Sequence, residues 1–140
     1  EYYKKLCPTE FDKIQSTHEV EPYVYPQMIA GPEHPKCGCG RNSWLTGTVA
    51  WMYTAVTQYI LGLRPAYKGL VIDPCIPSSW DDYKVTRQFR DGTVCVNVRN
   101  PDHVCKGIRK IFIDGIESKE CIIPPPLKGQ TINVEVELGK

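Results

Sequence analysis

Residues 43–61 constrain the fold of this chain most strongly, because their pattern predicts a helix that is apolar on nearly every side. Asn42 or Ser43 can cap the start of this helix, and Gly62 followed by Pro65 gives the order expected at its end. The apolar side chains that cover most of its circumference are Trp44, Leu45, Val49, Trp51, Met52, Tyr53, Val56, Tyr59, Ile60 and Leu61. Such a helix must be packed on nearly all sides, and the other helices needed to bury it are not among these 140 residues.

From Gly69 onward the apolar residues alternate with polar ones, which is the period of a β-strand. Six strands are predicted, over residues 70–72, 83–90, 93–99, 108–113, 116–123 and 131–138. Asp91-Gly92 and Asp114-Gly115 each lie between two of these strands, and Asp-Gly is favoured in two-residue hairpin turns because both positions tolerate positive φ. One face of each strand goes inward, so we expect an antiparallel β-sandwich.

The first 42 residues carry no sustained periodicity, and a free-standing domain rarely opens with so long an irregular segment. By length, 140 residues fit one domain, or one small domain plus a piece of another. Because the first residue is Glu1 and not Met, we expect the natural chain to begin further upstream. The sequence therefore divides into two unlike halves.

Composition and charge exclude several classes of partner. Seventeen Lys and Arg against sixteen Asp and Glu leave a net charge of +1, which provides no basic field for nucleic acid and no polybasic attraction to anionic lipid. No apolar run reaches the roughly 18 residues that a membrane span needs. Seven cysteines, an odd number, occur without a preceding targeting segment, so we expect mostly reduced thiols in a cytoplasmic protein.

The start of the predicted helix, residues 42–48, is the strongest candidate for chemistry. Helix N-termini expose about four backbone N–H groups and carry roughly half a positive charge, so they suit phosphate and other anions. Thr46 would add a hydroxyl donor, and Gly47 lets an anion approach the backbone closely. Taken alone, the segment fits an ordinary helix start better, in which Ser43 caps, Thr46 bonds a preceding carbonyl and Gly47 relieves a tight contact.

His34, Cys37 and Cys39 lie close together and invite comparison with a metal site. Zinc sites usually space paired cysteines by two to four residues and use about four ligands, whereas here the gap is one residue and a second cluster is missing. A glycine-rich turn with two incidental thiols is favoured, and no metal is predicted.

Acidic and aromatic residues of the second half offer two further possibilities, each with a structural alternative. Asp81-Asp82 and the acids of residues 117–120 resemble the paired acids of glycosidases, but nothing positions them opposite one another, so solvated charge is favoured. Three aromatic side chains could stack on a sugar, or could belong to the sandwich core, which we favour because aromatic residues contribute much buried area. These aromatic residues are Trp80, Tyr83 and Phe89.

Several motifs, met in order along the chain, carry a resemblance to a known family. They are Glu21-Pro22-Tyr23-Val24-Tyr25-Pro26-Gln27, Gly31-Pro32, Asn42-Ser43-Trp44-Leu45-Thr46-Gly47-Thr48-Val49-Ala50-Trp51, Gln58-Tyr59-Ile60-Leu61-Gly62-Leu63-Arg64-Pro65, Leu70 with Asp73-Pro74-Cys75-Ile76-Pro77, and Lys84-Val85-Thr86-Arg87. Together they resemble the C-terminal portion of glycoside hydrolase family 94, which contains the cellobiose, cellodextrin and chitobiose phosphorylases. The resemblance covers nearly the whole chain and is most specific between Glu21 and Arg87.

The resemblance implies a mixed α and β fold. Members of the family have an α/α six-hairpin barrel followed by a C-terminal β-sandwich. Residues 1–63 would then be the last segment and helix of the barrel catalytic domain, and residues 64–140 would be the antiparallel β-sandwich domain. The apolar helix would be a barrel helix whose neighbours lie in the remaining N-terminal part of the same enzyme.

The resemblance also implies a reaction, in which inorganic phosphate cleaves a β-linked disaccharide or oligosaccharide such as cellobiose with inversion, giving a sugar 1-phosphate. Phosphate is a substrate, no cofactor is needed, and homodimers are usual in the family. Thr46 is similar to the phosphate-binding threonine, and Gly47 would offer its N–H. Gln27 resembles the active-site glutamine near the phosphate and the donor sugar, while Trp44 and Arg41 are candidates by adjacency alone.

The family's general-acid aspartate and its phosphate-binding histidine and arginine come from motifs that nothing in residues 1–140 matches. No catalytic residue is therefore assigned in this chain, and we expect it to have no activity by itself. The alternative interpretation is an autonomous carbohydrate-binding β-sandwich module without catalysis, which would bind sugars through exposed aromatic residues such as Trp80.

Overall fold

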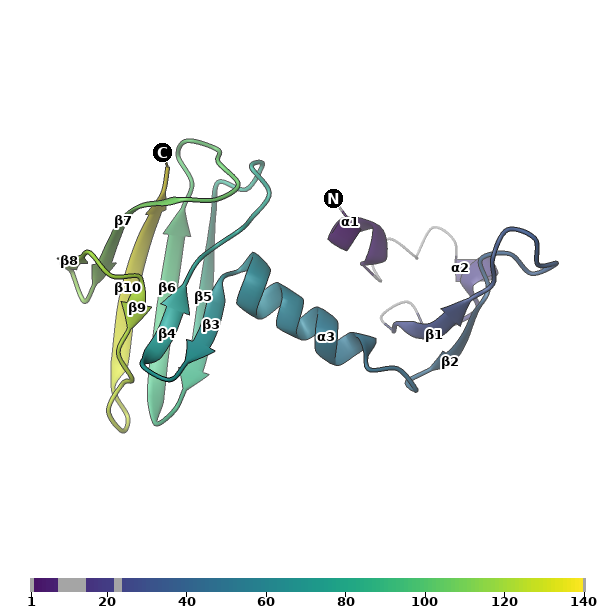
Figure 1. The fold of residues 1–140 in the computed structure, drawn as a ribbon, viewed down its shortest axis with the longest axis horizontal. Helices are drawn as coiled ribbons and strands as arrows, with labels where there is room; N and C mark the ends of the chain where they lie inside the picture. Colours follow the sequence, from purple (N-terminus) through teal and green to yellow (C-terminus); the bar gives the residue numbers. More distant parts are fainter. Residues whose placement is uncertain (1, 8–14, 22–23, 140) are drawn as a thin grey trace. The chain divides into compact units, whose positions relative to one another are not determined.

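The computed structural model describes residues 2–7, 15–21 and 24–139. The chain divides into two compact units, Glu1–Tyr53 and Thr54–Lys140 (Figure 1). Pro22 and Tyr23, which belong to the motif that begins at Glu21, lie outside the described residues. No helix in the described part of the chain is both long enough and apolar enough to cross a membrane.

Short elements build the first unit. Two helices, α1 (Tyr2–Leu6) and α2 (Gln15–His18), precede an antiparallel pair of strands, β1 (Pro26–Ile29) and β2 (Gly40–Ser43). The sequence pattern does not predict β1 or β2, because strands of four residues are too short to display an alternation of apolar and polar residues. Among the described residues of this unit, the buried apolar side chains are Val20, Val24 and Cys39.

The helix predicted over residues 43–61 begins five residues later than expected, which corrects that prediction. It comprises α3 (Thr48–Thr54) and continues as a π-helix, η2 (Ala55–Ile60). Ser43 ends strand β2 instead of capping the helix. Trp44, which follows it, has a φ of 70°, a left-handed backbone that a right-handed helix does not contain. The helix can begin only after this reversal of the backbone.

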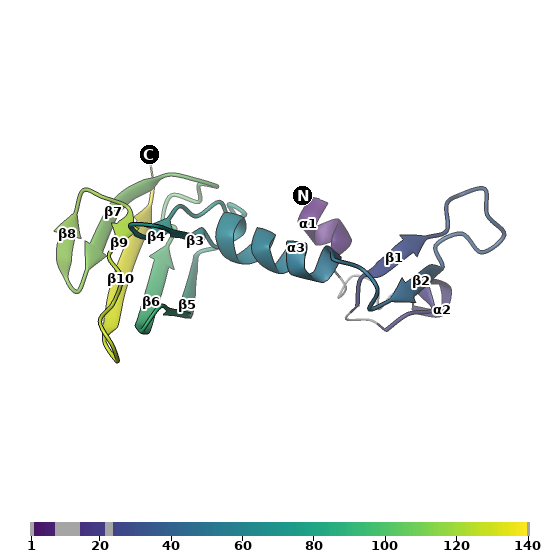
Figure 2. The same cartoon turned by 60° about the horizontal axis from the view of Figure 1, so that its bottom comes forward.

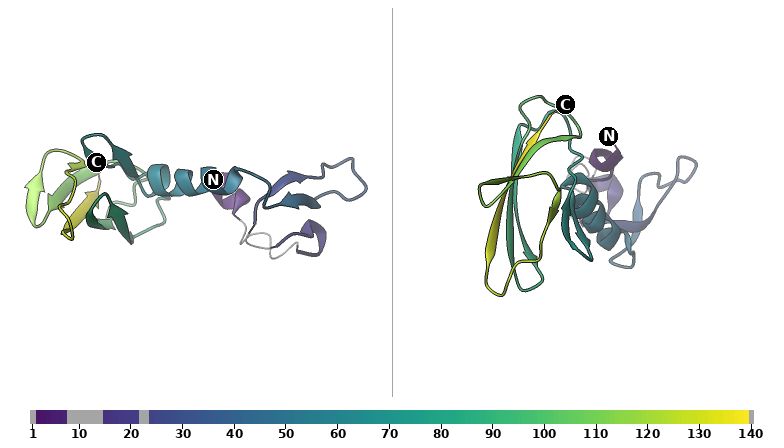
Figure 3. Two further views of the ribbon diagram at one scale, coloured as in Figure 1. Left: turned by 90° about the horizontal axis from the view of Figure 1, so that it is seen from below. Right: turned by 60° about the vertical axis from the view of Figure 1, so that its left-hand side comes forward.

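In the second unit, two sheets pack on a common core, an arrangement compatible with a β-sandwich. Strands β5 (Asp82–Phe89), β6 (Gly92–Arg99), β7 (Ile108–Ile113), β8 (Ile116–Ser118) and β10 (Thr131–Leu138) form one sheet in the order β5-β6-β10-β7-β8. Strands β3 (Leu63–Ala66), β4 (Gly69–Ile72) and β9 (Ile122–Ile123) form the other in the order β3-β4-β9. The sheets lie as two layers in Figures 2 and 3. One apolar cluster contains their buried side chains: Leu63, Leu70, Ile72, Ile76, Phe89, Val94, Val96, Val98, Ile111, Ile123, Ile132, Val134, Val136 and Leu138.

Most strands of this unit follow the predicted alternation. The predicted bounds of β7 and β10 are confirmed, and those of β4, β5 and β6 differ by no more than one residue at either end. The segment predicted as one strand over residues 116–123 is instead two strands, β8 and β9, which belong to different sheets. Strand β3 was not predicted, because it has four residues and contains Pro65.

Both predicted hairpins are confirmed, since β5 pairs with β6 and β7 pairs with β8 in antiparallel register. The β7–β8 turn is Asp114-Gly115, with φ values of 48° and 82°, as the Asp-Gly pair predicts. The β5–β6 turn is Arg90-Asp91, one residue earlier than predicted. Gly92 already belongs to β6, where an added Cβ would lie 2.5 Å from a carbonyl oxygen of the loop before β10.

The five-stranded sheet is mixed, which corrects the prediction of an antiparallel sandwich. Strand β10 pairs with β7 in antiparallel register but with β6 in parallel register. After β6 the chain passes through β7, β8 and β9, and β10 then inserts between β6 and β7. Parallel neighbours need such a long connection. Apolar alternation tells which face of a strand is buried but not the direction of its neighbour.

The end of the helix is attached to the sheets by hydrogen bonds within the second unit. Tyr83 donates its hydroxyl hydrogen to the Leu61 carbonyl at 2.6 Å, and the Asp73 N–H donates to the Gly62 carbonyl at 2.8 Å. Gly62 has a φ of 72°, and an added Cβ would overlap the Asp73 backbone. Glycine is required here both for its φ and for its lack of a Cβ, and the helix ends at this residue as predicted.

Replacing Gly62 by Ala should lower the free energy of unfolding by at least about 2 kcal/mol, because a left-handed backbone costs about 1–2 kcal/mol and the new methyl must also displace the Asp73 backbone. Urea unfolding of the whole chain measures this loss. Gly115→Ala is the matched control, since Gly115 has a φ of 82° but nothing lies within 4 Å of an added Cβ. Equal losses in the two variants would contradict the steric role of Gly62.

The Tyr83 side chain should make stability fall at alkaline pH. Burial raises the pKa of this phenol well above its usual value, so the folded state keeps its proton at a pH at which the unfolded state has lost it. The resulting stability is fully present below the unfolded pKa of about 10 and is lost as pH rises above it. Tyr83→Phe should remove this part of the pH dependence of unfolding. Tyr67→Phe, at a residue 96% exposed, should retain it, and equal alkaline slopes in both variants would disprove the assignment.

Candidate functional site

The segment between β2 and α3 holds the strongest candidate residues. Thr46 is half-buried and Gly47 is exposed. The Thr48 N–H donates to the Thr46 hydroxyl oxygen at 3.2 Å, and the two threonine hydroxyl oxygens lie 2.7 Å apart. Either hydroxyl can donate to the other. When Thr48 donates, the Thr46 hydrogen is left to donate to an anion. Thr48 is a residue that the sequence argument did not single out.

Gly47 leaves the backbone at the helix start open. Its carbonyl accepts the Trp51 N–H at 3.1 Å, which makes Gly47 the N-cap of α3. An added Cβ at Gly47 would meet nothing nearer than the Trp51 ring, at 3.9 Å. The fold of this chain therefore does not itself require glycine at residue 47, and its small size leaves room for a ligand to approach the backbone.

Gln27 and Trp44 are each held by a neighbouring polar side chain. The Asn42 amide donates to the Gln27 side-chain oxygen at 3.2 Å, across the β1–β2 pair. The Trp44 indole N–H donates to the Glu21 carboxylate at 3.0 Å, and this hydrogen bond lowers the pKa of Glu21. The sequence assigned no site role to either partner, Asn42 or Glu21, although Asn42 was a candidate helix cap.

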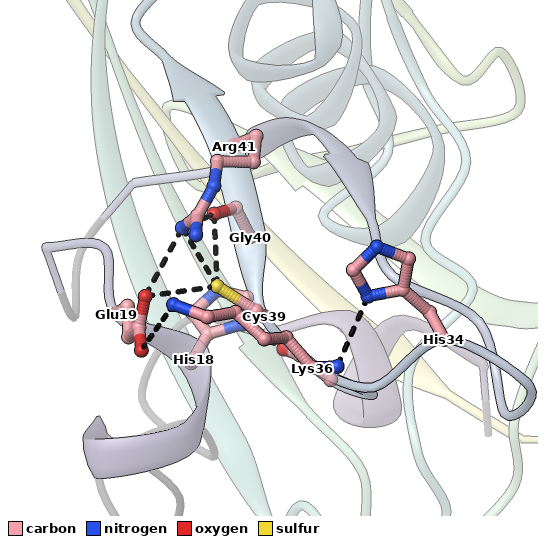
Figure 4. Close-up of polar contacts among 8 residues, drawn as sticks. His18, Glu19, His34, Lys36, Cys39, Gly40 and Arg41 are labelled. Atoms are coloured by element: carbon pink, nitrogen blue, oxygen red, sulfur yellow. Dashed lines mark hydrogen bonds and ion pairs between the residues drawn. The ribbon is translucent and has the colours of Figure 1, made fainter.

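Arg41 joins a polar network with Glu19 and Cys39 (Figure 4). One guanidinium nitrogen donates to the Glu19 carboxylate at 3.1 Å, to the Cys39 sulfur at 2.7 Å and to the Gly40 carbonyl at 2.9 Å. The Cys39 thiol also donates to Glu19 at 3.1 Å. Hydrogen bonds from Cys39 and then Arg41 lower the pKa of Glu19, so this carboxylate is ionised. Successive strand residues face opposite sides, which separates the Arg41 side chain from Gln27 and Asn42.

Two of the three residues compared with a metal site, His34 and Cys39, have other partners. Cys39 is buried in the Glu19 network, Cys37 is exposed, and the His34 ring nitrogen accepts the Lys36 N–H at 3.0 Å. Among residues 2–7, 15–21 and 24–139, no three His, Cys, Asp or Glu side chains are grouped so that they could hold a metal ion. Arg41, Lys36 and His34 line a depression of about 300 Å³.

The aromatic candidates of the second unit separate into two environments. Phe89 is buried in the core and Tyr83 packs against it, which confirms the core prediction for these two. Trp80 lies outside the buried core and is 38% exposed, which corrects the prediction for this residue. Asp81 and Asp82 beside it are exposed, as expected for solvated charge.

The segment that contains the candidate residues matches a known protein family. Residues 1–62 match the family described as "Glycosyl hydrolase 94 superfamily, catalytic domain". Residues 1–62 are therefore similar to the catalytic domain of that superfamily. The match includes Gln27, Arg41, Trp44, Thr46 and Gly47, and it ends at the glycine that terminates the helix. The resemblance inferred from the motifs is thereby confirmed.

Individual curated proteins align with nearly the whole chain. An N,N'-diacetylchitobiose phosphorylase of Vibrio proteolyticus is 44% identical over 99% of this chain. A solabiose phosphorylase of Paenibacillus borealis is 35% identical over 97% of it, and a cellobionic acid phosphorylase of Neurospora crassa is 34% identical over 94%. The aligned region is only 17%, 18% and 16% of the length of these relatives, respectively.

The buried Cys39 thiol should react far more slowly than the exposed Cys37 thiol two residues away. Burial, and then the hydrogen bond to Glu19, raise the pKa of Cys39, which lowers the fraction of reactive thiolate. Iodoacetamide labelling of the native chain, followed by peptide mass spectrometry, measures both rates. Labelling in urea is the control and should bring the two rates together, whereas equal rates in the native chain would show that the Glu19 network does not form.

Proposed function

We propose that this chain is the C-terminal part of an inverting disaccharide or oligosaccharide phosphorylase and contributes part of its phosphate site. The observation that carries the proposal is the family match over residues 1–62, which includes all five candidate residues. The relatives are phosphorylases of several different disaccharides. The shared chemistry is therefore cleavage of a glycosidic bond by phosphate, whereas the identity of the sugar differs among them.

In this proposal residues 1–63 are the last segment of the α/α barrel catalytic domain, and residues 64–140 are the C-terminal sandwich domain. The exposure of the helix supports it. Trp51, Tyr53 and Tyr59 are 74%, 67% and 58% exposed, although large aromatic side chains are normally buried or half-buried. Their burial would come from the remaining N-terminal part of the same enzyme, which is the partner of this chain.

The chemistry of the proposed site follows from the groups present. A phosphate oxygen attacks the anomeric carbon while the bond to the leaving sugar oxygen breaks, and a carboxylic acid supplies the proton to that oxygen. This acid would come from the remaining part of the enzyme, because no catalytic residue is assigned here. The Thr46 hydroxyl and the Gly47 N–H would donate to phosphate oxygens, at a helix start whose dipole also favours an anion. Phosphate is a substrate, and no cofactor takes part.

Gln27 is proposed to contact the donor sugar, since the Asn42 amide fixes its side-chain oxygen and leaves its NH₂ group to donate. Trp44 is a weaker candidate, with its indole N–H engaged by Glu21. Arg41 is weaker still, because its guanidinium already serves the Glu19 network. A cellobiose-like substrate, a homodimeric assembly and a cytoplasmic location are proposals that rest on the family alone.

The alternative, an autonomous carbohydrate-binding sandwich without catalysis, is favoured only by the exposure of Trp80. It does not account for the match of residues 1–62 to a catalytic domain. The phosphorylase is therefore the function that we adopt.

Thr46→Val in the enzyme that contains this chain should lower kcat/KM for phosphate by about 10- to 100-fold, because a hydrogen bond to a charged group contributes about 1.5–3 kcal/mol. Thr46→Ser should retain most of the activity. Gly47→Ala should raise KM for phosphate without lowering stability, since the added methyl meets no close neighbour in this chain. Release of sugar 1-phosphate at varied phosphate concentration measures these effects.

Thr131→Val, on an exposed residue of β10, is the control and should leave the phosphate dependence unchanged. An active Thr46→Val enzyme with the phosphate KM and kcat of the parent would contradict the role of Thr46. Failure of the complete enzyme to release sugar 1-phosphate from cellobiose, chitobiose or solabiose would contradict the proposed function itself.

A further inference from the structure

A surface of the second unit around Trp80 remains unused by the core and by the proposed phosphate site. We define the Trp80 corner as Trp80, Asp81, Asp82 and Arg99. Two depressions adjoin there, one of about 400 Å³ that includes Trp80 and Tyr83 and one of about 260 Å³ that includes Arg99. Both are lined by Asp81 and Asp82. Trp80 thus borders the first depression and Arg99 borders the second.

The backbone that carries Trp80 is held by the buried side chain of Asn100, which is 1% exposed. The Asn100 amide donates to the Trp80 carbonyl at 3.0 Å, and its backbone N–H donates to the Asp81 carbonyl at 2.7 Å. The same side chain also exchanges two hydrogen bonds with the Val104 backbone, each at 3.0 Å. Because the loop is fixed before any ligand arrives, binding there would cost little conformational entropy.

The Trp80 ring keeps at least one face free of its aromatic neighbour. It meets Tyr83 edge to face, with 6.2 Å between ring centroids and an interplanar angle of 65°. Such a contact covers at most one face of either ring. The 38% exposure of Trp80 therefore leaves apolar ring surface for a flat apolar partner.

Charged side chains lie in a row across the strands next to this ring. Asp82 of β5 is directly opposite Arg99 of β6, which in turn is opposite Glu137 of β10. Val98 and Val136, which precede Arg99 and Glu137, are buried, so the row lies on the outer face of the sheet. Neighbouring strands are about 4.8 Å apart, and carboxylates therefore alternate with a guanidinium at that spacing.

We infer that the Trp80 corner binds a neutral oligosaccharide, with one pyranose ring stacked on Trp80 in the first depression and hydroxyl groups of the saccharide bonded to Asp82 and Arg99 in the adjoining one. A pyranose presents an apolar C–H face and a rim of hydroxyls that both donate and accept. The apolar face matches the exposed ring, and charged planar groups form strong hydrogen bonds with hydroxyls. This site goes beyond the proposed function, because none of its residues belongs to the phosphate segment.

The mixed charge of the row favours a neutral saccharide over a cation. A cation would gain from Trp80 and from Asp81 and Asp82, but it would be repelled by Arg99 in the adjoining depression. Hydroxyl groups gain from both signs of charge, since they donate to the carboxylates and accept from the guanidinium. A cationic ligand is therefore an outcome to be tested against the saccharide.

The test is titration of the whole chain with cellotetraose and with chitotetraose, followed by calorimetry and by NMR of the tryptophan indole N–H signals. We expect a dissociation constant of about 1 mM or lower, with the Trp80 signal shifted. Trp80→Ala should weaken binding at least about tenfold, and Arg99→Gln should weaken it several-fold. Trp80→Phe should retain binding within about threefold and guards against loss of folding in the alanine variant.

Trp51→Ala is the matched control, because Trp51 is 74% exposed and lies in the first unit. It should leave the affinity unchanged. The inference would be overturned by absence of binding at about 10 mM tetrasaccharide, by equal affinity of the folded Trp80→Ala and parent chains, or by tighter binding of tetramethylammonium than of either saccharide. Loss of binding in Trp51→Ala would also overturn it. Each result is independent of the phosphate dependence measured for Thr46.

Discussion

The parallel pairing of β6 with β10 is the interaction on which the second unit depends. Its facing residues include three apolar pairs in register, Val94 with Ile132, Val96 with Val134 and Val98 with Val136. All six side chains are at most 3% exposed, and burial of each contributes roughly 1.5–3 kcal/mol relative to exposure. Strand β5 then adds to one side of this pair and β7 to the other. The smaller sheet covers the apolar face, and the outer face is left for the charged row beside Trp80.

The parts of this fold that could be predicted are those set by residues close together in the sequence. Alternation and Asp-Gly turns are local, and they located five strands and both hairpins. The direction of β10 depends on pairing with residues about 40 positions away, which no local pattern records. The helix start was misplaced because Trp44, directly after β2, has a left-handed backbone. A tryptophan gives no sequence signal for such a backbone, unlike glycine or asparagine.

The candidate site shows the same division between local and distant contacts. Thr46, Gly47 and Thr48 interact with one another or with Trp51, which are local contacts. Their arrangement was nevertheless not predicted, because the helix was expected to begin at residue 43 and begins at Thr48. Arg41 was proposed from adjacency, yet its side chain joins Glu19, 22 residues away. Glu19 lies between α2 and β1, outside both paired strands. Its contact with Arg41 could therefore not be predicted even from the pairing of β1 and β2.

The exposed aromatic residues of the helix connect folding with the proposed chemistry. Burying a side chain such as Trp51 releases free energy in proportion to its apolar area, and this gain is unrealised while the residue is 74% exposed. In the proposed enzyme the remaining barrel helices would supply that burial. Those helices would also exclude water from the start of α3, where hydrogen bonds to phosphate are stronger at lower dielectric. Burial of the apolar helix and completion of the phosphate site would then be one event. This explains why the candidate phosphate residues directly precede the helix whose exposed aromatic side chains would be buried by the rest of the enzyme.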